Sequence, residues 1–283
     1  MAIRTIFSMA EDCGRGERAG WAEFVRDFAG IARSLLTHYF PTLIPNLDEH
    51  VVAVFRQAGA SGGAWFAGLS FTNEREFMMA FRDLVFAYGR EQERAPAPPP
   101  VALEQLRAVM QDLMLLEREL LWLFIKGYDA QRIAAIMMNA AASAEAVQRV
   151  AAERLQALLP GAVPQRSKTG FVGDPGAAPE ALTLSARFLM EMAEQAKTEQ
   201  CVSLKTFNNL VNGQITWRER ELAEEHMSNC FYCIDRFTTF QEMVRLRKDT
   251  PPLAPPQVEA ILAQLPFSAG KPRGVLSRLF AGR

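Results

Sequence analysis

The stretch HMSNCFYC, at positions 226–233, places a histidine and two cysteines at i, i+4 and i+7. Because each helical residue turns the chain by about 100°, the three side chains lie along one stripe if the stretch is helical. Imidazole and thiolate are ligands that zinc prefers in proteins, and a closed structural zinc site has four ligands. The stretch therefore predicts that His226, Cys230 and Cys233 bind one zinc ion.

Cys201, which lies 25 positions before His226, can supply the fourth ligand. A short apolar helix ending at Asn212-Gly213 and a second helix separate the two residues, so the chain can turn back. The alternative is that Cys230 and Cys233 are small core residues and that His226 is a surface histidine. The chain has only four cysteines and three histidines, so four potential ligands within one segment favour the metal site.

Length and composition are those of an ordinary globular chain. Its 283 residues suffice for two or three domains, 49% of them are hydrophobic, and the net charge is −1. This near-neutral charge argues against a protein that coats nucleic acid, which carries a basic excess. No apolar run reaches the roughly 20 residues that span a bilayer, and Glu11 and Asp12 interrupt the N-terminal apolar residues. We therefore expect a cytoplasmic protein without membrane contact.

Proline-rich stretches divide the chain into three helical blocks. Residues 95–100 (APAPPP) and the Pro/Gly-rich residues 161–181 are predicted linkers, and a proline-rich basic tail covers 251–283. Strand-like alternation is absent, so an all-α, multi-domain fold is predicted. We call residues 1–94 the first block, residues 101–160 the second block and residues 182–250 the zinc segment.

In the first block, apolar residues at spacings of three or four predict helices over 21–39 and about 72–94. A shorter helix is expected over 47–58, after which the glycines of residues 59–63 are expected to force a loop. Trp65 and Phe66 follow these glycines. Their pattern favours core packing over contact with a separated DNA strand.

The second block has the outline of a helix-turn-helix. Helices are predicted over about 101–113 and 116–126, and Gly127 is expected to end the second of them. Asp129 is expected to cap a short helix to Met138, and Ser143 to cap a last helix that ends at Pro160. Many helical hairpins share this outline.

The segment around the predicted zinc ligands resembles a known family. Cys201, the run LVNGQIT at 210–216, Glu219 and the spacing H-x3-C-x2-C from His226 are similar to the zinc-binding anti-sigma domain family over about residues 183–250. In that family, a small zinc-bound helical bundle contacts and occludes a bacterial sigma factor. The resemblance implies four zinc ligands: Cys201, His226, Cys230 and Cys233.

The first two blocks then resemble regions two and four of extracytoplasmic-function sigma factors. The order and lengths of the helices match, as do the run LLEREL at 115–120, Ile133-Ala134 and Ser143. The resemblance implies that core RNA polymerase and promoter DNA are partners. It places polymerase contacts at Asp48, Val52 and Phe55, and DNA contacts at Arg75, Arg82, Ser143, Arg149 and Arg154.

The predicted recognition helix departs from the family pattern. It offers only Arg149 and Arg154 as cations, with Glu145 and Glu153 beside them, whereas phosphate and base contacts need cations. Two functions therefore stand side by side. The chain is a sigma-like transcription regulator restrained in cis by its own zinc segment, or it is a degenerate sigma-like scaffold or anti-sigma protein that binds polymerase or another sigma factor without reading promoter DNA.

An enzyme is not expected. The sequence has no glycine-rich phosphate loop and no Ser/His/Asp or Cys/His set outside the predicted zinc site. A zinc ion with four protein ligands also has no open position for a substrate, which is the structural form of such a site.

Overall fold

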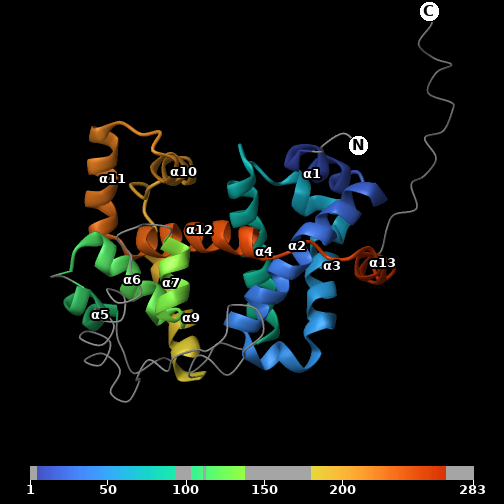
Figure 1. The fold of residues 1–283 in the computed structure, drawn as a ribbon, viewed down its shortest axis with the longest axis horizontal. Helices are drawn as coiled ribbons and strands as arrows, with labels where there is room; N and C mark the ends of the chain where they lie inside the picture. The colour runs from blue at the N-terminus through green and yellow to red at the C-terminus, as the bar shows by residue number, and fades with distance from the viewer. Residues whose placement is uncertain (1–4, 94–102, 111–112, 138–179, 266–283) are drawn as a thin grey trace, which may run out of the picture.

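The computed structural model describes residues 5–93, 103–110, 113–137 and 180–265. All regular elements among these residues are helices, which confirms the all-α prediction (Figure 1). The first block forms α1 (Ile6–Gly14), α2 (Arg18–Tyr39), the 3-10 helix η1 (Pro41–Asn46), α3 (Leu47–Ala67) and α4 (Glu74–Gln92). The second block contributes α5 (Leu103–Met110), α6 (Leu115–Ile125) and α7 (Ala130–Met137). The zinc segment comprises α9 (Glu180–Gln195), α10 (Leu204–Asn212), α11 (Trp217–Asn229) and α12 (Phe231–Asp249), and α13 (Pro255–Leu262) follows it.

Aromatic side chains fill the core of the first block. Phe24 and Phe28 of α2 pack against Phe55 of α3 and against Phe77 and Phe81 of α4, with ring centroids 4.9–6.0 Å apart. All five rings are fully buried. Aromatic pairs at such distances contribute about 0.5–1.5 kcal/mol each beyond the burial of their area. These rings therefore hold α2, α3 and α4 together as one unit.

The predicted loop after residue 58 is wrong. α3 continues through this stretch, and it accommodates Gly62 and Gly63 at φ values of +70° and +85°. Glycine adopts such values readily, because it has no Cβ. A Cβ at Gly63 would lie 3.2 Å from the backbone of Gly14, so this glycine also allows α1 to approach α3. Phe66 is buried with its ring centroid 5.4 Å from that of Trp21, which agrees with core packing.

Helix ends in the second block follow the predicted capping residues. α6 ends just before Gly127, whose φ of +89° lies in the left-handed region. Asp129 Oδ1 accepts a 2.7 Å hydrogen bond from the backbone N–H of Arg132 and so caps α7. The predicted recognition helix from Ser143 to Pro160 lies outside the described residues.

α12 crosses the middle of the molecule between the two blocks (Figure 1). It packs against α4 of the first block, against α6 and α7 of the second block, and against α9. Thirteen of its 19 residues are buried, including the consecutive runs 231–235 and 237–243. Because consecutive helical residues point in different directions, α12 is enclosed on all sides. One continuous cluster of buried apolar residues accordingly joins both blocks and the zinc segment.

α13 returns the chain to the first block. Leu253, which precedes α13, donates its backbone N–H to the Arg26 carbonyl of α2 at 2.8 Å. α13 then packs against α2. No helix in the described part of the chain is both long and apolar enough to cross a membrane.

Candidate metal centre

The structure brings the four predicted metal ligands together. One ligand atom from each of Cys201, His226, Cys230 and Cys233 lies within 4.8 Å of the other three. Cys201 precedes α10, His226 lies in the last turn of α11, Cys230 joins α11 to α12, and Cys233 lies in the first turn of α12. Three sulfur atoms and one imidazole nitrogen at this spacing can hold one metal ion.

The predicted single helix through the ligands is wrong. α11 ends at Asn229, and Cys230 has the extended backbone angles φ −124° and ψ 108° before α12 begins. In a continuous helix, His226 and Cys233 would be separated by about 10 Å along the axis, because each residue rises 1.5 Å. The break at Cys230 brings the side chains of His226 and Cys233 together. It also allows α12 to run in a different direction from α11.

The ligand geometry fits a tetrahedral ion. The Sγ atoms of Cys201 and Cys230 are 3.8 Å apart. Two sulfur ligands at about 2.3 Å from a tetrahedral zinc ion are separated by about 3.8 Å, whereas a disulfide bond is about 2.05 Å long. The Nε2 atom of His226 is buried without a hydrogen-bond partner. Coordination of a metal would satisfy this nitrogen.

Hydrogen bonds at the site favour the thiolate forms that metal binding requires. The backbone N–H of Thr198 donates to Cys201 Sγ at 3.2 Å, and that of Val202 donates to Cys233 Sγ at 3.3 Å. Hydrogen bonds from Cys233 to the sulfur of Cys230 lower the pKa of the Cys230 thiol to about 5. The pKa of Cys233 is raised, because its proton is shared with Cys230 and the side chain is buried. The hydrogen bonds at this pair thus favour the thiolate form of Cys230.

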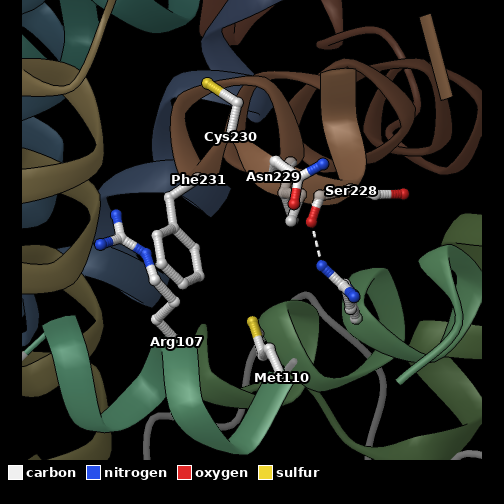
Figure 2. A pocket seen from close by; sticks show the side chains of 8 residues that line it. Arg107, Met110, Ser228, Asn229, Cys230 and Phe231 are labelled. Carbon is white, nitrogen blue, oxygen red and sulfur yellow. Dashed lines mark hydrogen bonds between the residues drawn. The ribbon is translucent and has the colours of Figure 1, made fainter. Parts of the chain in front are cut away.

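A pocket of about 250 Å³ adjoins the metal centre, between α5, α6 and the junction of α11 with α12 (Figure 2). Arg118 of α6 donates a hydrogen bond to the Ser228 carbonyl. Arg107 of α5 lies 5.7 Å from the ring centroid of Phe231. Figure 2 shows that the sulfur of Cys230 points away from this pocket. The pocket thus belongs to the contact between the second block and the zinc segment, and the Cys230 sulfur does not line its interior.

The arginines that were predicted to contact DNA in the first block face the zinc segment. Arg75 Nη1 donates to the Oδ1 atoms of Asn208 and Asn212 in α10, at 2.9 and 2.8 Å. Arg82 is only 4% exposed, and its guanidinium stacks on Phe86 at 3.6 Å from the ring centroid. In this arrangement Arg82 is therefore not accessible to DNA, because α4 packs against α12. Ser143, Arg149 and Arg154 lie outside the described residues.

The residues predicted to contact polymerase are divided between surface and core. The side chain of Asp48 is 82% exposed and pairs with Arg33. Val52 is only 4% exposed, and Phe55 is fully buried in the aromatic core. In this arrangement Phe55 therefore presents no surface to polymerase, contrary to the prediction. Val52 presents only a small part of its surface. A groove of about 390 Å³ is lined by Asp48, Val52 and, from the C-terminal helix, Ile261.

Sequence reasoning missed a set of buried charges between the second block and α12. Lys126 is fully buried, and Asp235 and Glu242 are 4% and 2% exposed. Two signals were available in the sequence. Lys126 directly follows the apolar run 120–125, and Asp235 and Glu242 are seven positions apart, which places them on one face of a helix.

The metal centre is thus defined by its own chemistry and by its place at the start of α12. Its four ligands form a closed set, which is the structural form of a metal site. Comparison with known proteins finds no family model, no curated protein and no solved structure that matches this chain.

Proposed function

We propose that this chain is a sigma-like regulator of transcription initiation whose zinc segment restrains the two sigma-like blocks in cis. Its partners are core RNA polymerase and promoter DNA, and its place of action is the cytoplasm. The zinc segment lies between the blocks, so that each block is held through its contact with α12. The linker at 161–181 joins the second block to the zinc segment covalently and keeps the zinc segment at a high effective concentration.

The observation that carries the proposal is the position of three arginines on α4. Two of them contact helices of the zinc segment, and the third is buried on α4, which packs against α12. Arg75 donates to two asparagines of α10, and Arg90 lies 3.4 Å from Glu191 of α9. Arg82, together with Lys126, lowers the pKa of Asp235 in α12 against the opposing effect of burial. The two residues of α4 that the resemblance places at DNA, Arg75 and Arg82, are therefore bound to the zinc segment or buried.

The surroundings of α3 also support restraint. α13 packs against α2 and lines one side of the groove that contains Asp48 and Val52. Arg56 of α3 donates to the Gln264 carbonyl at 3.0 Å, just after α13. A polymerase subunit that docks on this face of α3 would have to displace α13.

We assign zinc to the metal centre. Three cysteines and one histidine form a donor set typical of structural zinc, and the separation of two of the sulfurs matches a tetrahedral zinc site. The bound ion would fix the break between α11 and α12. It would thereby set the direction in which α12 enters the space between the two blocks.

One observation favours the second candidate, a scaffold that does not read DNA. α12 is enclosed on all sides, and its apolar residues are continuous with the cores of both blocks. Together with the low positive charge of the predicted recognition helix, this favours a chain that binds polymerase or another sigma factor as one integrated body.

Cleavage of the linker is expected to raise the affinity for core polymerase. A protease site is inserted within residues 165–175 of the full chain, and binding to core polymerase is measured before and after cutting. Once the tether is cut, the zinc segment competes only at its bulk concentration, so an increase of tenfold or more in affinity is expected, in line with typical effective concentrations. The uncut protein is the matched control. Equal affinities before and after cleavage would rule out restraint in cis.

Substitution of the two cations in the predicted recognition helix separates the two candidate functions. For a DNA-reading protein, Arg149→Ala and Arg154→Ala each weaken promoter binding by the polymerase complex and lower the salt dependence, by roughly one unit of slope per lost phosphate contact. Promoter retardation is measured over a series of salt concentrations. If both variants bind as the parent does, the second block does not read DNA and the scaffold function is the correct one.

A further inference from the structure

Charged side chains concentrate where α12 meets the two blocks. We call this contact surface the seam. Lys126 Nζ lies 3.1 Å from Asp235 Oδ1 and 3.5 Å from Glu242 Oε2, and all three side chains are at most 6% exposed. Trp122 Nε1 donates to Asp235 Oδ1 at 2.9 Å. The core of the first block differs from the seam, because edge-to-face phenyl rings build it.

Both blocks donate to one carboxylate of α12. Glu242 accepts hydrogen bonds from the hydroxyl of Tyr39 in the first block at 3.0 Å and from that of Tyr128 in the second block at 2.6 Å. Lys126 Nζ also donates to Thr239 Oγ1 at 2.7 Å. Glu242 is thus the point at which the first block, the second block and the zinc segment meet.

Further ion pairs lie along the same seam. Arg236 of α12 binds Asp83 of α4 through two hydrogen bonds of 2.8 Å. Arg132 of α7 pairs with Asp249 near the end of α12. The cations come from both sides of the seam, so the contact depends on charge pairing across it as well as on apolar packing.

A charged seam opens more readily than an apolar one. The desolvation penalty of a buried ion pair offsets most of its attraction, and each charge regains its hydration when the contact opens to water. An apolar contact of the same area gains nothing comparable on opening. Removal of only one partner of a buried ion pair strongly destabilises the closed contact, because it leaves a buried charge unpaired.

We infer that Lys126, Asp235 and Glu242 form an ionic latch, and that the molecule opens along the seam when this charge balance is lost, while the first block and the metal centre stay folded. That such opening frees the sigma-like blocks rests on the function proposed above. The latch itself is testable without polymerase or DNA, so its failure is distinguishable from failure of the proposed function.

The test uses the full zinc-loaded chain and Lys126→Met, which keeps an unbranched apolar stem and removes the charge. Side-chain exposure is measured by hydroxyl-radical footprinting with mass spectrometry. Trp122 and Tyr128, which are buried at the seam, are expected to react at least fivefold faster than in the parent. Trp21, which is buried in the first block, is expected to react at the parental rate. Zinc content is expected to stay at one equivalent.

A charge-balanced variant distinguishes a latch from simple packing. Lys126→Met combined with Asp235→Asn and Glu242→Gln removes all three charges of the latch and keeps acceptors for Trp122 and the two tyrosines, so the rates are expected to return to within twofold of the parent. Arg132→Met removes a cation from a partly exposed pair across the same seam, between α7 and α12, and we expect parental rates at Trp122.

Two results would overturn the latch. One is parental reactivity of Trp122 in Lys126→Met, and the other is a triple variant as reactive as the single one. If Lys126→Met exposes Trp21 as well, the core of the first block is lost, and the triple variant then distinguishes a latch from simple packing. Parental reaction rates of Trp122 and Tyr128 in that variant support the latch, and raised rates overturn the latch.

Discussion

The variant Cys233→Ala is expected to lose the bound zinc, from one equivalent in the parent to less than about 0.2, and to lose at least about 3 kcal/mol of stability. Cys233 is fully buried, and its sulfur belongs to the ligand cluster. Three ligands cannot close a structural site, and the break between α11 and α12 then loses the ion that fixes it. Zinc content is measured by elemental analysis, and stability by denaturant unfolding with and without chelator.

The matched control is Cys13→Ala. Cys13 is also buried, at 1% exposure, but it lies outside the ligand cluster. Burial raises the pKa of its thiol, so it stays protonated and does not compete for the metal. We expect a loss of about 1 kcal/mol and full zinc content. Parent protein with well under one equivalent of zinc, or Cys233→Ala with undiminished zinc, would contradict the metal assignment.

Trp122→Ala is expected to destabilise the chain by about 3–5 kcal/mol, because a fully buried indole leaves a cavity that the surroundings fill only in part. The ring also stacks on Phe231, with centroids 5.6 Å apart, and its N–H donates to Asp235. The substitution therefore removes packing and a hydrogen bond at the start of α12. Denaturant unfolding monitored by far-UV circular dichroism measures the change.

Two further substitutions separate these contributions. Trp122→Phe keeps most of the ring and removes the donor to Asp235, so a loss of about 1–3 kcal/mol is expected. Trp217→Ala changes a tryptophan that is 75% exposed, and we expect an effect within about 0.5 kcal/mol. Equal effects of Trp122→Ala and Trp217→Ala would show that the second block does not pack on α12 as described.

The capping residues and the metal ligands were predictable because they depend on neighbours that are close in sequence. Gly213, where a short helix was expected to end, has the left-handed conformation at the end of α10, and Thr216 and Glu219 form a capping box at the start of α11. A single reversal of the chain, at Asn212-Gly213, is enough to bring Cys201 back to the other ligands. Local hydrogen bonds and ligand chemistry are properties of a residue type and its spacing, so a pattern in the sequence suffices to predict them.

The course of the helices was harder to predict where a local sequence preference competes with contacts between segments. The glycines of residues 59–63 are typical of a loop, yet α3 continues through them, because the approach of α1 and the burial of Phe66 against Trp21 stabilise the helix. The spacing of the metal ligands is typical of one helix, yet the helix breaks at Cys230. In both places contacts between segments outweigh the local preference.

By itself, the sequence determined that this protein is helical, where several helices begin and end, and which four potential metal ligands come together. Only the tertiary structure decided that α12 is a central helix with two carboxylates inside the molecule. Its sequence has no apolar stripe that would predict this position. A buried carboxylate is stable only beside partners that compensate its lost hydration. Those partners, Tyr39, Lys126 and Tyr128, lie more than 100 positions away along the chain, and only the folded arrangement brings them to Glu242.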